Sequence, residues 1–387
     1  MGPAEWPENI DWLRRNEFPL TESWAYLNHA ATGPLPAAHV RAAEHFLHAS
    51  STSRPATSLT DYASKAEEVR GLAAALLRCL PEEIALLTST TGALALVPLG
   101  LEWRTGDEVI LYEREFPNVV FPWLQLRKRG VRIRFVPDRG NRFELEELVD
   151  LITPRTRVVS LSLVNFASGF RAPVEEIGRA CADRGSWLLV DAIQAVGAIP
   201  VLPASLGADV LAAAGYKHLL SGYAVALCYC SERARRELVI PAPGWPGTSE
   251  FTSNDGILNY ESITFASSAR RFEPSVPSFS GLWGAAKSLG LLVNADPARI
   301  ERHVYGLLDG LVGELRDRNY AINSSLNPAE RSTLLSVSPP GELDQTGLED
   351  ALRRHRVAVS IREGAIRVSP HLYNTRSDIE RLLEVLP

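Results

Sequence analysis

The sequence has few cysteines and no long apolar run. Its four cysteines, Cys79, Cys181, Cys228 and Cys230, include no second pair at metal-ligand spacing, which argues against a metal site and favours buried, reduced thiols. No stretch reaches the length of a membrane-spanning helix, and the polar start "MGPAEWPENIDWLRRNEF" has no apolar signal core. We therefore expect a cytoplasmic protein with neither a metal centre nor a membrane partner.

Basic residues do not outnumber acidic ones. Lys and Arg number 40 against 46 Asp and Glu, for a net charge of −6. There is no basic run and no interleaving of basic with aromatic residues, so nucleic-acid binding is not expected. The glycine motifs of nucleotide-binding loops, GK[ST] and GxGxxG, are missing as well. The hydrophobic fraction of 45% is typical of a soluble globular protein, and 387 residues predict two domains.

Apolar, strand-like segments alternate with helix-like segments over the first two thirds of the chain. The strand-like segments lie at 84–89, 107–113, 131–137, 157–164, 186–193, 209–215 and 224–230. Helical spacing or helix-ending residues mark 144–152 and 173–185 between them. This alternation predicts an α/β domain with a mainly parallel sheet. Such sheets bind ligands beyond the carboxyl ends of their strands.

The pattern changes near residue 265. Two helix-like stretches, at 281–294 and 297–318, are followed by shorter strands and helices up to the end of the chain. We expect a large domain over 21–265, a smaller α+β domain over 266–387, and an N-terminal segment, 1–20, that packs with the small domain.

Polar or aromatic side chains follow three of the strand-like segments. "TSTTG" at 88–92 offers hydroxyls and free backbone amides at the start of a helix, which suits a phosphate, although capping needs only one such residue. Phe116 follows the segment at 107–113. Asp191 ends an apolar run, where a carboxylate is either paired with a cationic group or serves as a helix cap.

Lys217 lies in "VLAAAGYKHLLSGY", among small and apolar residues, although lysine is seldom fully buried. Either its stem lies on apolar surface with the ammonium in water, or it is a Schiff-base lysine whose burial makes the neutral amine accessible. A phosphate site, an aromatic plate, a carboxylate and an amine are together what pyridoxal 5′-phosphate (PLP) requires. The sequence therefore predicts PLP as the cofactor.

With these features, the chain resembles the class V aminotransferase family of fold-type I PLP-dependent enzymes, which contains cysteine desulfurases, selenocysteine lyases and isopenicillin N epimerase-like proteins. The segments that carry the resemblance occur in the family's order: "YLNHAATGPLP", "STTGA", "EREFPNVVFPW", "VDAIQAVGAIPV", "GYKHLL", "RRFEPSVPSF" and "IRVSPHLYNT". The resemblance implies a large domain with a mainly parallel seven-stranded sheet and a smaller α+β C-terminal domain. It also implies a homodimer, with the "RRFEPSVPSF" region near the partner's active site.

The resemblance also implies roles for individual residues. Lys217 would be the Schiff-base lysine and Asp191 the partner of the pyridinium nitrogen, and these two are the expected catalytic residues. The other expected cofactor-binding residues are Phe116 on the ring, Gln194 and Asn165 near the phenolic oxygen, and Thr90, Thr91 and Tyr216 at the phosphate. The expected substrate-binding residues are Asn28, His29 and Arg367, of which Arg367 would clamp the α-carboxylate.

Several positions depart from the family's pattern. No cysteine follows residue 230, whereas cysteine desulfurases carry a nucleophilic cysteine before the final strand, so a persulfide-forming desulfurase is not expected. Ser275-Val276 stands where relatives have Gly-Thr. In those relatives the threonine contacts the phosphate bound by the partner subunit. In this chain Ser275 or Ser278 would have to make that contact. Ala224 stands where glycine is common. Arg362 is either a second anion contact or a solvated strand residue.

Two classes of function fit these residues. The first is an enzyme on a small amino acid or amino-acid conjugate, and we expect a lyase that eliminates a sulfur-bearing β-substituent in specialised or sulfur metabolism. Epimerisation, transamination and decarboxylation-coupled deamination would use the same residues. The second is a non-catalytic PLP-binding scaffold, which would not need the substrate clamp at Arg367.

Overall fold

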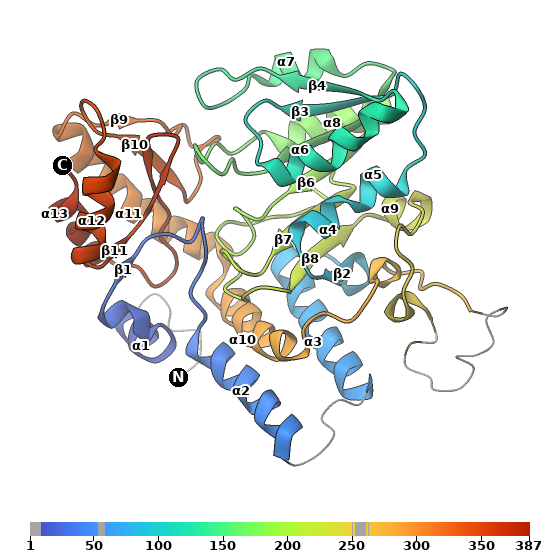
Figure 1. The fold of residues 1–387 in the computed structure, drawn as a ribbon, viewed down its shortest axis with the longest axis horizontal. Coiled ribbons are helices and arrows are strands. Elements are labelled where there is room, and N and C mark those ends of the chain that lie inside the picture. Colours follow the sequence, from blue (N-terminus) through green and yellow to red (C-terminus); the bar gives the residue numbers. More distant parts are fainter. Residues whose placement is uncertain (1–8, 53–58, 250, 252–260, 262) are drawn as a thin grey trace.

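The computed structural model describes residues 9–52, 59–249, 251, 261 and 263–387. A seven-stranded sheet forms the centre of its larger part (Figure 1). In spatial order the strands are β2 (Ile84–Leu87), β8 (Ala226–Cys230), β7 (Val210–Ala214), β6 (Trp187–Asp191), β5 (Thr156–Ser162), β3 (Glu108–Tyr112) and β4 (Arg132–Val136). Strand β8 is antiparallel to both neighbours, and the other strands of this sheet share one direction. The predicted α/β fold with a mainly parallel sheet is confirmed.

The inner strands β6, β7 and β8 are buried along their whole length because both faces of the sheet are covered there, as parallel sheets require, whereas the edge strand β4 is partly exposed. Successive residues of a strand point to opposite faces. Thus Leu188 and Val190 belong to one hydrophobic core and Trp187 and Leu189 to the other. The burial of both faces explains why the sequence shows continuous apolar runs here rather than alternation.

Helices surround the sheet and extend below it (Figure 1). The α-helices are α1 (Ile10–Glu17), α2 (Ala37–Thr52), α3 (Leu59–Leu77), α4 (Thr90–Leu94), α5 (Leu96–Gly100), α6 (Pro117–Leu124), α7 (Leu145–Leu151), α8 (Val174–Arg184), α9 (Glu232–Glu237), α10 (Phe279–Ala295), α11 (Pro297–Asp317), α12 (Gln345–Arg354) and α13 (Arg376–Val385). Helix α10 packs against α2 and α3.

A second, antiparallel sheet lies in the C-terminal part beside α11, α12 and α13 (Figure 1). Its strands, in order, are β12 (Ser360–Arg362), β13 (Ala365–Val368), β10 (Leu335–Ser338) and β9 (Ala321–Ile322). A short parallel pair, β1 (Ala25–Tyr26) with β11 (Val357–Ala358), joins the N-terminal segment to this part.

Helix α1 is held by the C-terminal helix. Arg14 donates to the Asp378 carboxylate at 2.6 Å, and the rings of Phe18 and Tyr373 lie 4.2 Å apart. Residues 1–8 of the expected N-terminal segment lie outside the described residues. The domain boundaries at residues 20 and 265 stay predictions.

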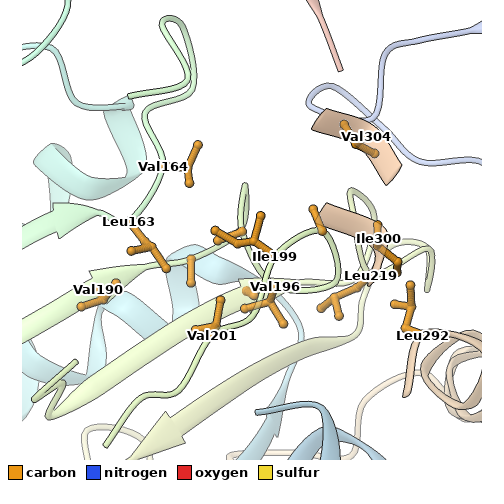
Figure 2. Close-up of a cluster of buried hydrophobic side chains, with 14 of the residues drawn as sticks. Leu163, Val164, Val190, Val196, Ile199, Val201, Leu219, Leu292, Ile300 and Val304 are labelled. Carbon is orange, nitrogen blue, oxygen red and sulfur yellow. The ribbon is translucent and has the colours of Figure 1, made fainter. Parts of the chain in front are cut away.

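One apolar cluster joins the two parts of the molecule beneath the loops that follow β6 and β7 (Figure 2). Val196 and Ile199 come after β6, and Leu219 comes after β7; they pack with Leu292 of α10 and Ile300 of α11. Since these side chains are at most 2% exposed, the loops that bear the predicted site residues are anchored on a close-packed base.

Candidate active site

Five of the predicted site residues lie at or beyond the ends of strands that run in the same direction, so they gather at one edge of the large sheet. Asp191 ends β6, and Lys217 follows β7. Phe116 follows β3, Thr90 begins the helix after β2, and Asn165 follows β5. This is the edge where open α/β sheets bind their ligands.

Lys217 is buried, with 7% of its surface exposed. Its Nζ lies 5.7 Å from the centroid of the Phe116 ring and 5.8 Å from that of Tyr216. Burial lowers the pKa of Lys217 to about 8; Asp191 opposes this shift, and the cationic Arg367 adds to it. The solvated alternative is therefore not the one observed, and the amine is partly neutral near physiological pH, as a nucleophilic lysine requires.

Asp191 is buried at the end of β6, and its Oδ1 accepts a hydrogen bond from Ile193 N at 2.9 Å. Burial raises the pKa of Asp191 to about 6, while the Ile193 hydrogen bond and Lys217 lower it. The carboxylate thus makes one local, cap-like bond. The structure also leaves it electrostatically coupled to the amine of Lys217.

A second carboxylate, Glu115, was not singled out from the sequence. It accepts hydrogen bonds from Ser162 N at 2.7 Å and from Ser162 Oγ at 2.5 Å, and Ser162 pairs with Asp191 across β5 and β6. Burial raises the pKa of Glu115 to about 7, and the nearby Asp191 contributes to this rise. The only sequence signal was its place next to Phe116.

The hydroxyl side chains of the segment after β2 make different contacts. Ser89 is the N-cap of α4, and its Oγ accepts from Gly92 N at 3.1 Å. Thr90 is buried and its Oγ1 accepts from Ala214 N of β7 at 3.1 Å, whereas Thr91 is exposed. Since Ser89 alone provides the cap, capping does not account for the two threonines. Their role at the phosphate stays a prediction.

Gln194 is buried, and both the nitrogen and the oxygen of its side-chain amide form hydrogen bonds. Its Nε2 donates to Ala30 O at 3.0 Å, and its Oε1 lies 3.2 Å from His218 Nε2, which therefore carries the proton. His218 stacks with His29 and His371, at centroid separations of 6.2 and 5.6 Å. The structure thus places His29 in a fully buried stack, where Nδ1 contacts Ser369 O at 3.0 Å. Sequence reasoning missed His218, and the substrate role of His29 stays a prediction.

Arg367 is a buried cation without an acidic partner among the described residues. It donates to Phe166 O at 2.6 Å and to Ser360 Oγ at 3.3 Å, and its buried Nε has no hydrogen-bond partner there. Burial lowers the pKa of Arg367 to about 10. Ser360 Oγ in turn donates to Asn28 Oδ1 at 2.5 Å, so two of the predicted substrate-binding residues, Arg367 and Asn28, both contact Ser360.

Asn165 is hydrogen-bonded to backbone groups, and Tyr216 stacks on a second tyrosine. Asn165 Nδ2 donates to Arg114 O at 2.9 Å, while its Oδ1 accepts from Ala167 N and Ser168 N at 3.0 Å. Tyr216 stacks on the exposed Tyr223 at 4.7 Å. These contacts link the loop of Asn165 to that of Arg114, and the predicted role of Asn165 at the phenolic oxygen is untested.

The loop after Lys217 contains a left-handed residue, Ala224, with φ 63°. Glycine adopts this conformation with less strain than residues with a side chain. The structure thus gives a physical reason for the glycine expected at this position, and this chain retains the turn with alanine in its place.

Comparison with known proteins places the chain in a family. The family model for class V aminotransferases matches residues 25–382. A probable cysteine desulfurase of Methanothermobacter thermautotrophicus is 28% identical, covering 96% of each chain. An uncharacterized aminotransferase, YcbU, of Bacillus subtilis is 27% identical over 83% of this chain and 82% of its own length.

Solved structures share the fold. The apo cysteine desulfurase from Thermococcus onnurineus superposes with a TM-score of 0.85 at 24% identity, covering 98% of this chain and 96% of its own. The cystine C–S lyase C-DES, in complex with its reaction product cysteine persulfide, gives 0.86 at 21% identity, covering 95% and 98%.

The chain belongs to the class V aminotransferase family, with the fold-type I architecture. It is a PLP-dependent enzyme of that family, and the cofactor predicted from the sequence is confirmed. The site fits this cofactor, because it holds a buried amine of lowered pKa within 5.8 Å of the centroids of two aromatic rings, and a buried carboxylate with a single backbone donor. The buried Nε of Arg367, which has no hydrogen-bond partner among the described residues, is a further free donor.

The buried charge of Lys217 should destabilise the cofactor-free protein at neutral pH. Because the pKa falls from 10.5 to about 8 on folding, stability is lost as the pH falls from 10.5 through 8. We expect Lys217→Met to raise the unfolding free energy by about 1–3 kcal/mol at pH 7. The gain should shrink as the pH approaches 10.5. Denaturant titrations of the cofactor-free proteins at pH 7 and pH 10 measure it.

The matched control is Lys287→Met, which removes an exposed lysine from α10. It should change stability by less than about 0.5 kcal/mol at either pH. A loss of stability in Lys217→Met at pH 7 would show instead that the attraction to Asp191 outweighs the burial of the ammonium.

Proposed function

We propose that this protein is a C–S β-lyase that cleaves a small sulfur-bearing amino acid into a thiol, a keto acid and ammonia. The observation that carries the proposal is the pairing of a complete proton-transfer and carboxylate site with the lack of a thiol beside it. Cys181, Cys228 and Cys230 are buried in the two cores, and Cys79 follows the end of α3. None of the four lies at the strand edge that carries Lys217.

Each site residue has a task in this proposal. PLP, when bound, supplies the electron sink that acidifies the hydrogen on the substrate's α-carbon. Lys217 Nζ takes up the α-proton, for which a pKa near 8 is well matched to neutral pH. Asp191 holds a proton on the ring nitrogen by its negative charge. Arg367 binds the α-carboxylate through donors that no acidic side chain of the described chain occupies.

Elimination needs no protein nucleophile, because the sulfur leaves with the electrons of the broken C–S bond. The balance is one water consumed, with one thiol, one keto acid and one ammonium formed from each conjugate. The solved C–S lyase C-DES, which shares this fold, supports such a reaction. The relatives named as probable cysteine desulfurases support the competing activity, in which sulfur is passed to an enzyme thiol.

These two activities are separable with cysteine and an S-alkyl cysteine as substrates. We expect thiol and keto acid in equal amounts from the S-alkyl conjugate, and no persulfide on the protein after incubation with cysteine. Mass spectrometry of the intact chain reads the second result. A persulfide on one of the four cysteines, together with alanine in solution, would establish a desulfurase and refute the proposal.

Epimerase, aminotransferase, decarboxylating deaminase and PLP-binding scaffold remain the alternatives, because they would retain the same residues. A homodimer is likewise proposed from the family resemblance, and the cytoplasmic location expected from the sequence stays a prediction. In this chain Ser275 lines a cavity of about 240 Å³ together with Thr88 and Gly92. This places Ser275 beside the predicted phosphate segment of its own chain, and its contact with a partner's phosphate stays a prediction.

A further inference from the structure

Arg362 shares a face of the C-terminal hairpin with the carboxylate clamp. Strands β12 and β13 pair antiparallel, with Ser360 opposite Arg367 and Arg362 opposite Ala365. Because every second residue of a strand points to the same face, Arg362, Ser360 and Arg367 lie on one face. Arg367 donates to Ser360 Oγ on this face, beside Asn28.

The tip of the hairpin is fixed in place. Its two-residue loop, Glu363 and Gly364, has φ values of 51° and 77°, as a tight hairpin turn with two left-handed residues requires. Glu363 forms an ion pair with Arg114, which lies two residues before Phe116. This ion pair connects the tip of the hairpin to the loop that carries Phe116. Arg362 is thereby held at the rim of the site.

No acidic side chain among the described residues neutralises Arg362. Its one hydrogen bond is to the backbone carbonyl of the adjacent Ile361, at 3.2 Å, and the neighbouring Glu363 is already paired with Arg114. Arg367 also lacks an acidic partner in this part of the chain. The substrate side of the site therefore presents two guanidinium groups, whereas the α-carboxylate of an amino acid needs one.

Arg362 is close enough to the site for its charge to act on both Lys217 and Arg367. Repulsion from Arg362 lowers the pKa of both Lys217 and Arg367. An anion bound beside Arg362 would relieve this repulsion. Arg362 is exposed, yet its charge acts on the buried Lys217, as expected for a residue at the rim of the site.

We propose that Arg362 binds a second negative charge, at the end of the substrate's side chain, so that the enzyme selects dianionic amino-acid conjugates. This inference rests on the proposed function for the identity of the substrate, and it deepens it by naming the substrate class. The expected substrate has an α-carboxylate for Arg367 and a distal carboxylate, or a comparable anion, for Arg362. A guanidinium suits both, because it binds carboxylates with two parallel hydrogen bonds.

The test compares two conjugates of nearly equal shape, S-carboxymethyl-L-cysteine and the neutral S-carbamoylmethyl-L-cysteine. Titration of the PLP-loaded enzyme, followed by its visible absorbance, gives a dissociation constant for each, and thiol release gives kcat/KM. We expect the wild-type enzyme to bind the charged conjugate at least about tenfold more tightly, a ratio that falls as salt is added. In Arg362→Gln this ratio should fall below about twofold.

The control is Arg353→Gln on α12, an exposed arginine paired with Asp350, which should keep the wild-type ratio. A sulfur-free pair, glutamate and glutamine, repeats the binding comparison without any C–S bond. Equal affinity within both pairs, or an unchanged ratio in Arg362→Gln, would overturn the inference. Preferential binding of the charged conjugate without thiol release would support it while refuting the lyase. Equal thiol release from both conjugates would support the lyase alone.

Discussion

Borohydride reduction of the PLP-loaded protein should attach the cofactor to Lys217, and Lys217→Ala should lower kcat by at least about 10³-fold. The chain has four lysines, at 65, 128, 217 and 287, and Lys217 is the one that is buried. Its amine has a lowered pKa and lies near the rings of Phe116 and Tyr216. No other lysine combines these features. Peptide mapping after reduction reads the attachment site.

The remaining three lysines serve as the internal control. Lys65 is paired with Glu68, and Lys128 and Lys287 are exposed, so none of them should carry the reduced adduct in stoichiometric amount. Loss of colour in Lys217→Ala is not sufficient evidence, because PLP can also bind without a covalent bond. A stoichiometric adduct on another lysine would refute the assignment of Lys217.

Asp191→Asn should keep the fold and lose about 10²–10⁴-fold in kcat. The amide oxygen of asparagine can still accept the hydrogen bond from Ile193 N, so the cap-like contact survives the change. What is lost is the negative charge that keeps a proton on the ring nitrogen of the cofactor. Thermal unfolding and turnover, measured on the same preparation, separate these two contributions.

Asp209→Asn is the matched control for this substitution. Asp209 is also a buried aspartate beside β6, where its Oδ2 accepts from Leu188 N at 2.9 Å and lies 3.6 Å from Arg233. We therefore expect the Asp209→Asn variant to be less stable than the wild-type protein but to keep a turnover near the wild-type value. Near-wild-type turnover in Asp191→Asn would instead show that the Asp191 carboxylate is only a structural cap.

The fold was predictable because its signals are local. Six of the seven expected strands of the large sheet contain the observed one, as 186–193 contains β6, and the expected segment 157–164 overlaps β5, which begins one residue earlier. The expected helix at 173–185 matches α8, whose C-cap Gly185 is left-handed with φ 71°. Continuous apolar runs, together with proline and glycine at helix ends, suffice to locate such elements.

The missed features depend on contacts between distant residues. Glu115 acts through Ser162, 47 residues away, and His218 stacks on His29 and His371 from opposite ends of the chain. The β1–β11 pair joins Ala25 to Val357. No spacing in the sequence indicates these neighbours, because the fold alone brings them together.

The central claim is that the α-proton is removed and a sulfur group leaves from the β-carbon. The most direct measurement follows a cysteine S-conjugate carrying deuterium at the α-carbon in ordinary water, with products and remaining substrate analysed together. We expect loss of deuterium to solvent together with equal amounts of keto acid and thiol. Intact, racemised substrate without deuterium would identify an epimerase, and a product that has lost carbon dioxide but keeps its deuterium would identify a decarboxylating enzyme; either result would rule out β-elimination as the reaction of this enzyme.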